Sequence, residues 1–314
     1  MPEIHLDTDI GGDTDDLCAL ALVLAWPGAE LLAVTTVSDD GGRRAGYARH
    51  ALGLAGRAGV PIAAGADISL GCYTPTPGFP EREEAYWPEP VAPAPTPHEE
   101  ALDLLERSIA RGALVVAIGP YTNLALLERR APGILREARL WLMGGHFFAP
   151  RAGFPQWDYR DDWNIQVDYA SALHVFERSS PTLVPLSVTV ETWLRHAHLP
   201  ALKRSTSPLA RLVARQAEAF AAGEWNKADY GRTYAGLPDD IVNFQHDPLA
   251  CAVALGWDEG VEVGELPLKF EVADGFLRQR VEEGGRMTKV VTKADGARFS
   301  EFWLDTVTAA LQEG

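Results

Sequence analysis

The stretch Asp7–Asp16, which reads DTDIGGDTDD, decides how this chain is interpreted. It places five carboxylates within ten residues, and such crowding is unfavourable unless a cation neutralises the charge. The residues before it, Ile4–Leu6, are typical of the end of a buried strand, and the apolar run 17–26 after it is typical of a buried helix. The acidic stretch is therefore predicted to be a loop between the carboxyl end of a strand and a helix, where open α/β sheets place ligands.

Two glycines in this stretch favour metal binding. Gly11 and Gly12 can adopt backbone conformations that other residues avoid, so several carboxylates can turn toward one point. A hard cation such as calcium takes six to eight oxygen ligands, and the loop offers several. The alternative is that the aspartates only cap the following helix, but this leaves Asp7 and Asp9 unexplained. An EF-hand does not fit, because Cys18 stands where that motif needs a glutamate.

Length and composition indicate one large α/β domain over residues 1–314, because 46% of the residues are apolar. The net charge of −16 argues against nucleic acid or an anionic membrane as a partner. We expect a cytoplasmic protein, because the sequence shows no signal segment and no apolar run of roughly 18 residues. The three cysteines, Cys18, Cys72 and Cys251, are predicted to be reduced packing residues.

Strand-like and helix-like segments alternate through the first two-thirds of the chain, which predicts βαβ units and a mostly parallel, Rossmann-like open sheet flanked by helices. The pattern Thr96 to Glu99 predicts a capping box at the start of one of these helices. The last part changes to strand character and predicts a C-terminal hairpin around Glu282–Gly285, followed by a helix over 299–311. Expected strands lie at 30–37, 60–65, 114–119, 140–143 and 182–188, and expected helices at 43–57, 98–111 and 208–222.

Two irregular segments are predicted to form flaps beside a binding site, over about 71–97 and 223–240. The first holds eight prolines, and long excursions of this kind in compact domains are often binding loops. Trp87 in the first flap and Trp225 and Tyr230 in the second can either contact a ligand or pack the flap onto the body.

Further polar residues follow the other predicted strands. Each has an ordinary structural explanation as a turn or helix-cap residue, and Pro248 also fits the first turn of a helix. The residues are Asp40, Thr122 in the turn GPYTNL, Asp162 and Asn164 in the sequence DDWN, and His246 and Asp247 in the sequence HDP. Of these, Thr122 and Asp247 fall, like the acidic loop, at strand-to-helix turns that a doubly wound sheet brings to one rim.

The order of these motifs resembles the inosine-uridine-preferring nucleoside hydrolase family along nearly the whole chain. The resemblance implies a calcium ion bound by Asp9, Asp16, Asp247 and the backbone carbonyl of Thr122. It also implies that Asp9 deprotonates the attacking water and that His246 assists the leaving base. The substrate contacts that it implies are Asp15, Asp40, Asp162 and Asn164.

Two departures from the family pattern stand out. Two extra residues, including Asp13, lie between Asp9 and the pair Asp15-Asp16. A histidine that the family often carries near the first flap has no match here, where His98 is the nearest.

The function implied is calcium-dependent hydrolysis of the N-glycosidic bond of ribonucleosides by a dimer or tetramer. Its transition state resembles a sugar cation, which surrounding carboxylates stabilise. The alternatives are a nucleoside-binding protein without turnover and a metal-dependent phosphohydrolase. The latter chemistry needs a Lys or Arg phosphate clamp, and no basic residue follows the acidic loop before Arg43. The pattern leaves the preferred base open.

Overall fold

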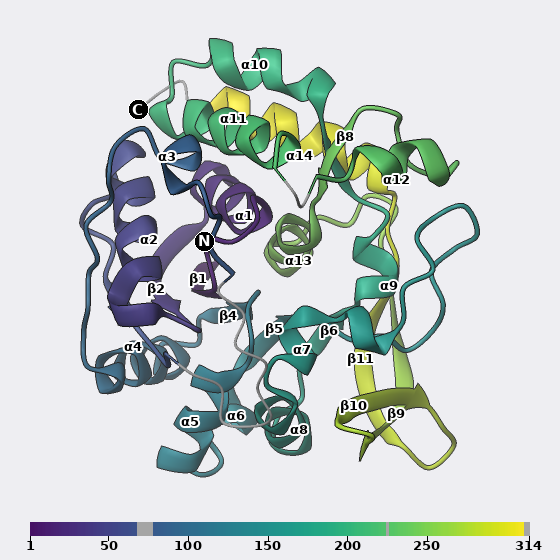
Figure 1. Cartoon of the computed structure of the whole chain (residues 1–314). Coiled ribbons are helices and arrows are strands. Elements are labelled where there is room, and N and C mark those ends of the chain that lie inside the picture. Colours follow the sequence, from purple (N-terminus) through teal and green to yellow (C-terminus); the bar gives the residue numbers. More distant parts are fainter. Residues whose placement is uncertain (68–77, 224–225, 311–314) are drawn as a thin grey trace.

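A computed structural model of the chain describes residues 1–67, 78–223 and 226–310. Within these residues, a nine-stranded sheet in the order β10-β9-β11-β6-β5-β4-β1-β2-β3 lies between helices on both faces (Figure 1). Its strands are β1 Glu3–Thr8, β2 Glu30–Thr36, β3 Ile62–Ala64, β4 Leu114–Ala117, β5 Arg139–Met143, β6 Thr182–Val184, β9 Glu262–Ala273, β10 Phe276–Val281 and β11 Arg286–Lys293.

The sheet is mostly parallel, as predicted, and among the described strands of this sheet only the pairs that involve β9 are antiparallel. β1 pairs with β2 on one side and with β4 on the other. The strand order therefore reverses at β1, and a crevice opens at the carboxyl ends of the strands at such a reversal. The acidic loop leaves β1 at this point.

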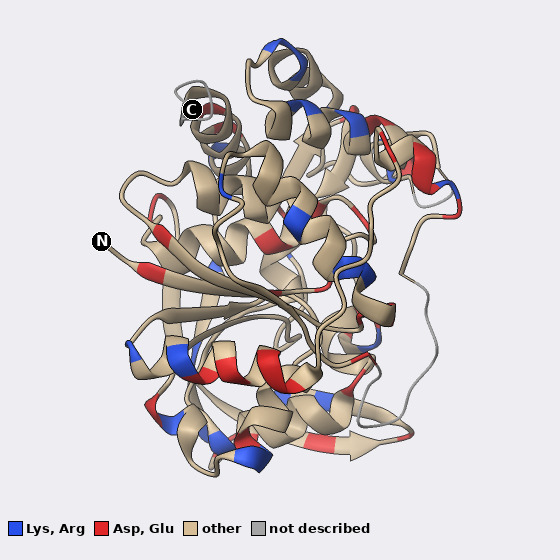
Figure 2. Cartoon of the chain, turned by 90° about the vertical axis from the view of Figure 1, so that its left-hand side faces the viewer, with Lys and Arg blue, Asp and Glu red and all other residues tan. Residues whose placement is uncertain are grey.

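Helices cover both faces of the sheet, which Figure 2 shows nearly edge-on. One face carries α1 Asp15–Ala25, α2 Arg43–Leu54, α11 Pro208–Ala221, α13 His246–Leu255 and α14 Gly296–Ala310, and the other carries α4 His98–Ala110, α5 Thr122–Arg130 and α8 Tyr169–Arg178. The shorter elements are α3 Glu83–Tyr86, α6 Ile134–Glu137, α7 Trp163–Gln166, α9 Leu186–Thr189, α10 Leu199–Arg204, α12 Ala228–Thr233, the 3-10 turns η1 Asp40–Gly42, η2 Tyr159–Asp161 and η3 His196–His198, and a small sheet of β7 Trp193–Arg195 and β8 Ile241–Phe244.

The core forms because central strands bury both faces. In β4, Leu114 and Val116 belong to the cluster under α1 and α13, whereas Val115 and Ala117 belong to the cluster under α5 and α8. Successive side chains of a strand point to opposite faces, so an uninterrupted apolar run fills both cores. Burying each such aliphatic side chain contributes roughly 1.5–3 kcal/mol.

The predicted hairpin around Glu282–Gly285 is wrong, because β10 and β11 both pair with β9, one on each side. The hairpin turn is instead Asp274-Gly275, with φ values of 54° and 79°, as a two-residue type I′ turn requires. The Glu282–Gly285 segment crosses β9, so that a Cβ added to Gly285 would lie 2.8 Å from the backbone of Leu268. The C-terminal hairpin and helix exist, but the turn lies earlier than predicted.

Two local predictions also need correction. The Thr96 hydroxyl does not cap α4 but accepts from the Ala64 N–H at 2.9 Å and donates to the Ala64 carbonyl at 3.2 Å, which ties the chain to the edge strand β3. The strand expected at 182–188 ends at Val184, because Pro185 follows and α9 begins.

Two of the three cysteines lie in the described part of the chain. Cys18 and Cys251 are buried free thiols, as predicted, and Cys72 lies outside the described residues. No helix in residues 1–67, 78–223 and 226–310 is long and apolar enough to cross a membrane.

His5 on β1 is fully buried and neutral. Its Nδ1 bonds the Ser108 hydroxyl at 2.8 Å and its Nε2 bonds the Thr35 hydroxyl at 3.0 Å. Burial lowers the pKa of His5 to about 3, whereas a histidine in the unfolded chain takes up a proton near pH 6.5. The His5 contribution to stability is therefore present above about pH 6.5 and is lost as the pH falls toward 3.

We expect acidification from about pH 6.5 to about pH 4.5 to cost the wild type more stability than the variant His5→Gln. The one proton accounts for up to about 1.4 kcal/mol per pH unit. Asp7 acts in the opposite sense, because burial raises its pKa to about 7, so the variant comparison is what isolates His5. Urea unfolding at both pH values measures this, and equal losses in the two proteins would contradict it.

Candidate active site

The acidic loop joins β1 to α1 and is held by its own hydrogen bonds. The Thr8 hydroxyl donates to the Asp16 carboxylate and accepts from the Ile10 N–H at 3.2 Å. Asp13 Oδ1 accepts from the Asp15 N–H at 3.0 Å, and the N-cap residue of α1 is Thr14. Within this loop, the capping explanation therefore fits Asp13, and it leaves Asp15 and Asp16 for another role.

Gly11 lets the loop turn, as the sequence predicts. Its φ is 111°, which side chains rarely adopt, and a Cβ there would overlap the Tyr47 ring. Tyr47 cannot move aside easily, because it is buried and stacks on Trp87 with ring centroids 4.4 Å apart.

We expect Gly11→Ala to displace the acidic loop and to cost about 1–3 kcal/mol of stability. The aspartates of the loop would then lose their common direction, so metal affinity should fall together with stability. Thermal unfolding and calcium titration measure the two effects. Gly53→Ala is the matched control, because no atom lies within 4 Å of a Cβ at that helical position. A Gly11→Ala protein that binds calcium as tightly as the wild type would refute the expectation.

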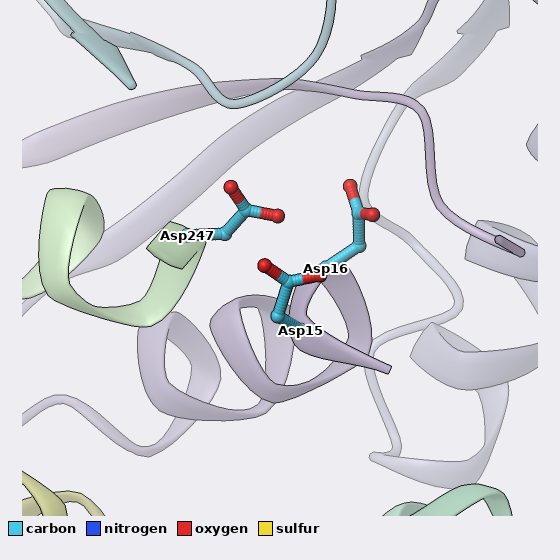
Figure 3. A group of neighbouring side chains, drawn as sticks. All are labelled: Asp15, Asp16 and Asp247. Carbon is cyan, nitrogen blue, oxygen red and sulfur yellow. The ribbon is translucent and has the colours of Figure 1, made fainter. Parts of the chain in front are cut away.

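Three buried carboxylates from two helices meet at the centre of the site. Asp15 and Asp16 come from the first turn of α1, and Asp247 comes from the first turn of α13, which packs against α1. One oxygen of each lies within 4.8 Å of those of the other two, and Figure 3 shows the three side chains around a common space. Asp247 is the second residue of α13 and not its N-cap, which is Gln245, so the predicted capping role of Asp247 is wrong.

The electrostatics of this cluster call for a cation. Burial, followed by the charge of neighbouring carboxylates, raises the pKa values of Asp15, Asp16 and Asp247 well above the usual range. Burial also raises the pKa of Asp9, and the charge of Asp9 contributes to the shifts of Asp16 and Asp247. Oxygen ligands at this density suit a hard divalent cation, so these residues fit a metal ion.

The cluster lines a cavity of about 730 Å³, a size within the range of roughly 300–1,000 Å³ found for ligand sites. The cavity walls combine carboxylates with aromatic rings and two cations. Besides the three clustered aspartates, the lining includes Asp9, Asp13, Arg44, Trp157, Asp161, Asp162, Trp163, Asn164, Phe220, Lys227, Tyr230 and His246.

Asp162 and Asn164 stand on one wall of the cavity, at the start of α7. Asp162 accepts from the N–H groups of Gly145 and Ile165, and burial raises its pKa to about 6. Asn164 Nδ2 donates to the carbonyl oxygens of Ile118 at 2.8 Å and Met143 at 3.1 Å. The protein thus uses the Asn164 amide nitrogen, and its carbonyl oxygen is the atom that it offers to a ligand.

His246 and an aromatic group form another part of the wall. His246 Nδ1 bonds the Thr189 hydroxyl at 2.7 Å, which leaves Nε2 for a ligand, and burial lowers the pKa of His246 to about 4. The ring of Trp157 lies 6.1 Å from that of His246 and 5.8 Å from that of Tyr230, between centroids. Tyr230 therefore faces the cavity, and Trp157 is an additional aromatic residue that the sequence prediction did not single out.

Two predicted site residues lie outside the cavity lining. Asp40 is exposed in η1, whereas its neighbour Asp39 is buried and accepts from the Thr36 hydroxyl at 2.6 Å. The position of Asp40 thus gives no support to its predicted substrate contact. Thr122 is buried at the start of α5 and donates its hydroxyl to Asp168 Oδ2 at 2.7 Å, so the role of its backbone carbonyl stays a prediction.

The structure describes only part of the two predicted flaps. Trp87 is buried and stacks on Tyr47, so it packs the first flap onto the body. Residues 71–77 of that flap and Trp225 in the second lie outside the described residues.

Arg44 is a site residue that the sequence did not reveal. It is 3% exposed and donates to the carbonyl oxygens of Ser38, Asp9 and Ile10, and it also lines the cavity. Its charge opposes the upward pKa shifts of Asp9 and Asp16. The sequence around Arg44 carries no signal for this position, because the partners of Arg44 are backbone carbonyls of other loops.

Comparison with known proteins identifies the family. The model of the family "Inosine-uridine preferring nucleoside hydrolase" matches residues 4–301. The pyrimidine-specific ribonucleoside hydrolase RihA of Enterobacter sp. (strain 638) is 30% identical over 309 residues, which covers 93% of this chain and 87% of that protein.

Solved structures agree with this fold. A purine-preferring ribonucleoside hydrolase from Gardnerella vaginalis has a TM-score of 0.75 at 21% identity and covers 99% of this chain and 100% of its own. The plant nucleoside hydrolase PpNRh1 has a TM-score of 0.76 at 20% identity, with 98% of this chain and 99% of its own covered. The solved structures establish the architecture. The match to the family model and to RihA establishes that the chain belongs to the inosine-uridine preferring nucleoside hydrolase family, a family of N-glycosidases.

Proposed function

We propose that this protein hydrolyses the N-glycosidic bond of ribonucleosides in a calcium-dependent reaction, giving ribose and a free base. The observation that carries the proposal is the convergence of Asp15, Asp16 and Asp247 in the floor of a nucleoside-sized cavity. Family membership supports the reaction class. We assign the ion to Asp9, Asp16, Asp247 and the carbonyl of Thr122; when bound, calcium would supply oxygen coordination for a water and the sugar diol and would make that water more acidic.

The protein's own groups perform the remaining steps. Asp15 and Asp162 accept hydrogen bonds from ribose hydroxyls, and Asn164 accepts through its carbonyl oxygen; Asp40 is a weaker candidate for the same role. Asp9 takes a proton from the attacking water as general base. The carboxylates around the sugar stabilise the positive charge that develops as the glycosidic bond lengthens.

The leaving base would lie against His246, Trp157 and Tyr230. Aromatic side chains bind the faces of planar bases, and His246 Nε2 is placed to hydrogen-bond a base nitrogen. His246 is therefore the first candidate to assist the departing base, as the sequence resemblance implies.

A panel assay tests this proposal. Purified protein is incubated with uridine, cytidine, inosine, adenosine and guanosine, with and without chelator, and released reducing sugar is measured. Release of ribose from at least one nucleoside, lost with chelator, is the expected result. The panel needs both base classes, since RihA of Enterobacter is named pyrimidine-specific and the Gardnerella protein purine-preferring.

Other results of the panel would support the alternatives. Calorimetric binding of a nucleoside without release of its base would support a binding protein without turnover. Phosphate release from a nucleotide, with the nucleoside untouched, would support a phosphohydrolase; the Arg44 donors already engaged by backbone carbonyls argue against a phosphate clamp there. Cytoplasmic location and a dimeric or tetrameric state stay predictions from the sequence.

A further inference from the structure

Strand β10 is an edge of the main sheet, and a glutamine from α7 completes its outer side. Gln166, the last residue of α7, accepts from the Leu277 N–H at 3.0 Å and donates to the Leu277 carbonyl at 2.9 Å. The same Nε2 donates to the Tyr159 carbonyl at 2.8 Å. One side chain thus joins three backbone groups, and it satisfies the outward-facing donor and acceptor that an edge strand leaves unpaired.

A second glutamine, from β10 itself, reaches the loop that follows β5. Gln279 is 6% exposed, and its Oε1 accepts from the His146 N–H at 2.8 Å. His146 directly follows Gly145, whose N–H donates to the carboxylate of Asp162. A chain of two adjacent peptide groups therefore connects Gln279 to Asp162.

Both glutamines act on the segment that carries Asp162 and Asn164. Gln166 fixes the end of the four-residue helix α7, in which Asn164 lies. So short a helix has little stability of its own and depends on tertiary contacts. The ring of Tyr159, just before α7, also packs edge-on against Phe276 of β10 at 6.2 Å between centroids.

We propose that Gln166 and Gln279 are positioning residues, through which β10 holds Asp162 and Asn164 in place for the ribose. The assignment of the ribose to these two residues rests on the proposed function. Each glutamine acts through backbone groups and touches no substrate. Displacing a binding group by about 1 Å can cost up to about a hundredfold in rate, so two partly buried glutamines behind Asp162 and Asn164 are enough to control substrate binding.

The metal cluster provides an internal reference for this proposal. Asp15, Asp16 and Asp247 are carried by α1 and α13, and no hydrogen bond within the described residues joins either glutamine to these helices. Loss of the glutamine contacts should therefore weaken nucleoside binding without weakening the binding of the ion. A general loss of folding would weaken both.

The test compares Gln166→Met and Gln279→Met, which keep side-chain volume and remove the hydrogen bonds, with the wild type. We expect KM for the best nucleoside to rise about tenfold in each, with kcat and the calcium dissociation constant within about twofold of wild type. Gln279→Glu keeps the acceptor for the His146 N–H and should restore KM, whereas Gln166→Glu lacks the two donors and should not. Arg280→Gln on the same strand is the control, because Arg280 forms ion pairs with Glu271 of β9 and with Glu282, away from Asp162 and Asn164.

Hydrogen exchange supplies a readout that needs no turnover. The amides of Gly145, His146 and Ile165 should exchange faster in the two methionine variants, and those of α1 and α13 should not change. Unchanged KM and unchanged exchange at these amides would overturn the proposal. A wild type that releases no base while the variants show the local exchange would instead overturn the proposed function and leave the positioning contacts standing.

Discussion

Replacing Asp16 by Asn should lower kcat/KM for a nucleoside by about a thousandfold or more, because it removes charge from the cluster that we propose to bind the ion and to stabilise the developing sugar cation. Asp247→Asn should have an effect of similar size, since the two side chains lie in one cluster although they come from different helices. Both substitutions keep the volume of the side chain nearly constant, because Asn and Asp have the same shape.

Stability separates this effect from simple unfolding. In the presence of chelator, Asp16→Asn should unfold at the wild-type temperature or above it, because one of several mutually repelling buried carboxylates has been neutralised. With calcium present, only the wild type should gain stability. Asp103→Asn is the matched control, since Asp103 lies exposed on α4 and pairs with Arg130. Near-normal turnover in Asp16→Asn would remove the basis of the proposed mechanism.

The fold and the centre of the site could be predicted because their signals are local. The acidic loop lies between an apolar strand and an apolar helix, and Gly11 marks its turn; the strand-to-helix alternation places this loop at the rim of a parallel sheet. The partner Asp247 is far away in sequence, and the resemblance to a family supplied it. In the structure, Asp16 and Asp247 lie in one cluster.

The remaining features depend on tertiary neighbours and leave no local pattern. Thr96 and Glu99 satisfy the spacing of a capping box, yet the Thr96 hydroxyl bonds the backbone of β3 instead. Alternation identifies β10 and β11 as strands but does not say that both pair with β9. The roles of Arg44 and Gln166 are equally hidden, because each bonds backbone groups that any sequence would present.

Removing the metal should abolish turnover and also lower the unfolding temperature. An ion that binds only the folded protein stabilises it by about 2.7 kcal/mol at a free concentration of one hundred times its dissociation constant. For a chain of this size that corresponds to roughly 4 °C in the midpoint of thermal unfolding. Turnover would be lost for a different reason, since the ion that we propose to orient the sugar hydroxyls and the water would be gone.

The measurement is thermal unfolding and nucleoside hydrolysis after exhaustive chelation, followed by addition of calcium or magnesium. Calcium should restore both, and magnesium should restore less, because it demands near-ideal octahedral geometry and gives up its waters reluctantly. Asp247→Asn should show little response to either ion, which ties the thermal shift to the cluster rather than to exposed acidic residues elsewhere on a chain of net charge −16. If the wild type kept its midpoint and its turnover after chelation, the buried carboxylates would have to be held by protons and hydrogen bonds alone, and the ion would have no part in the reaction.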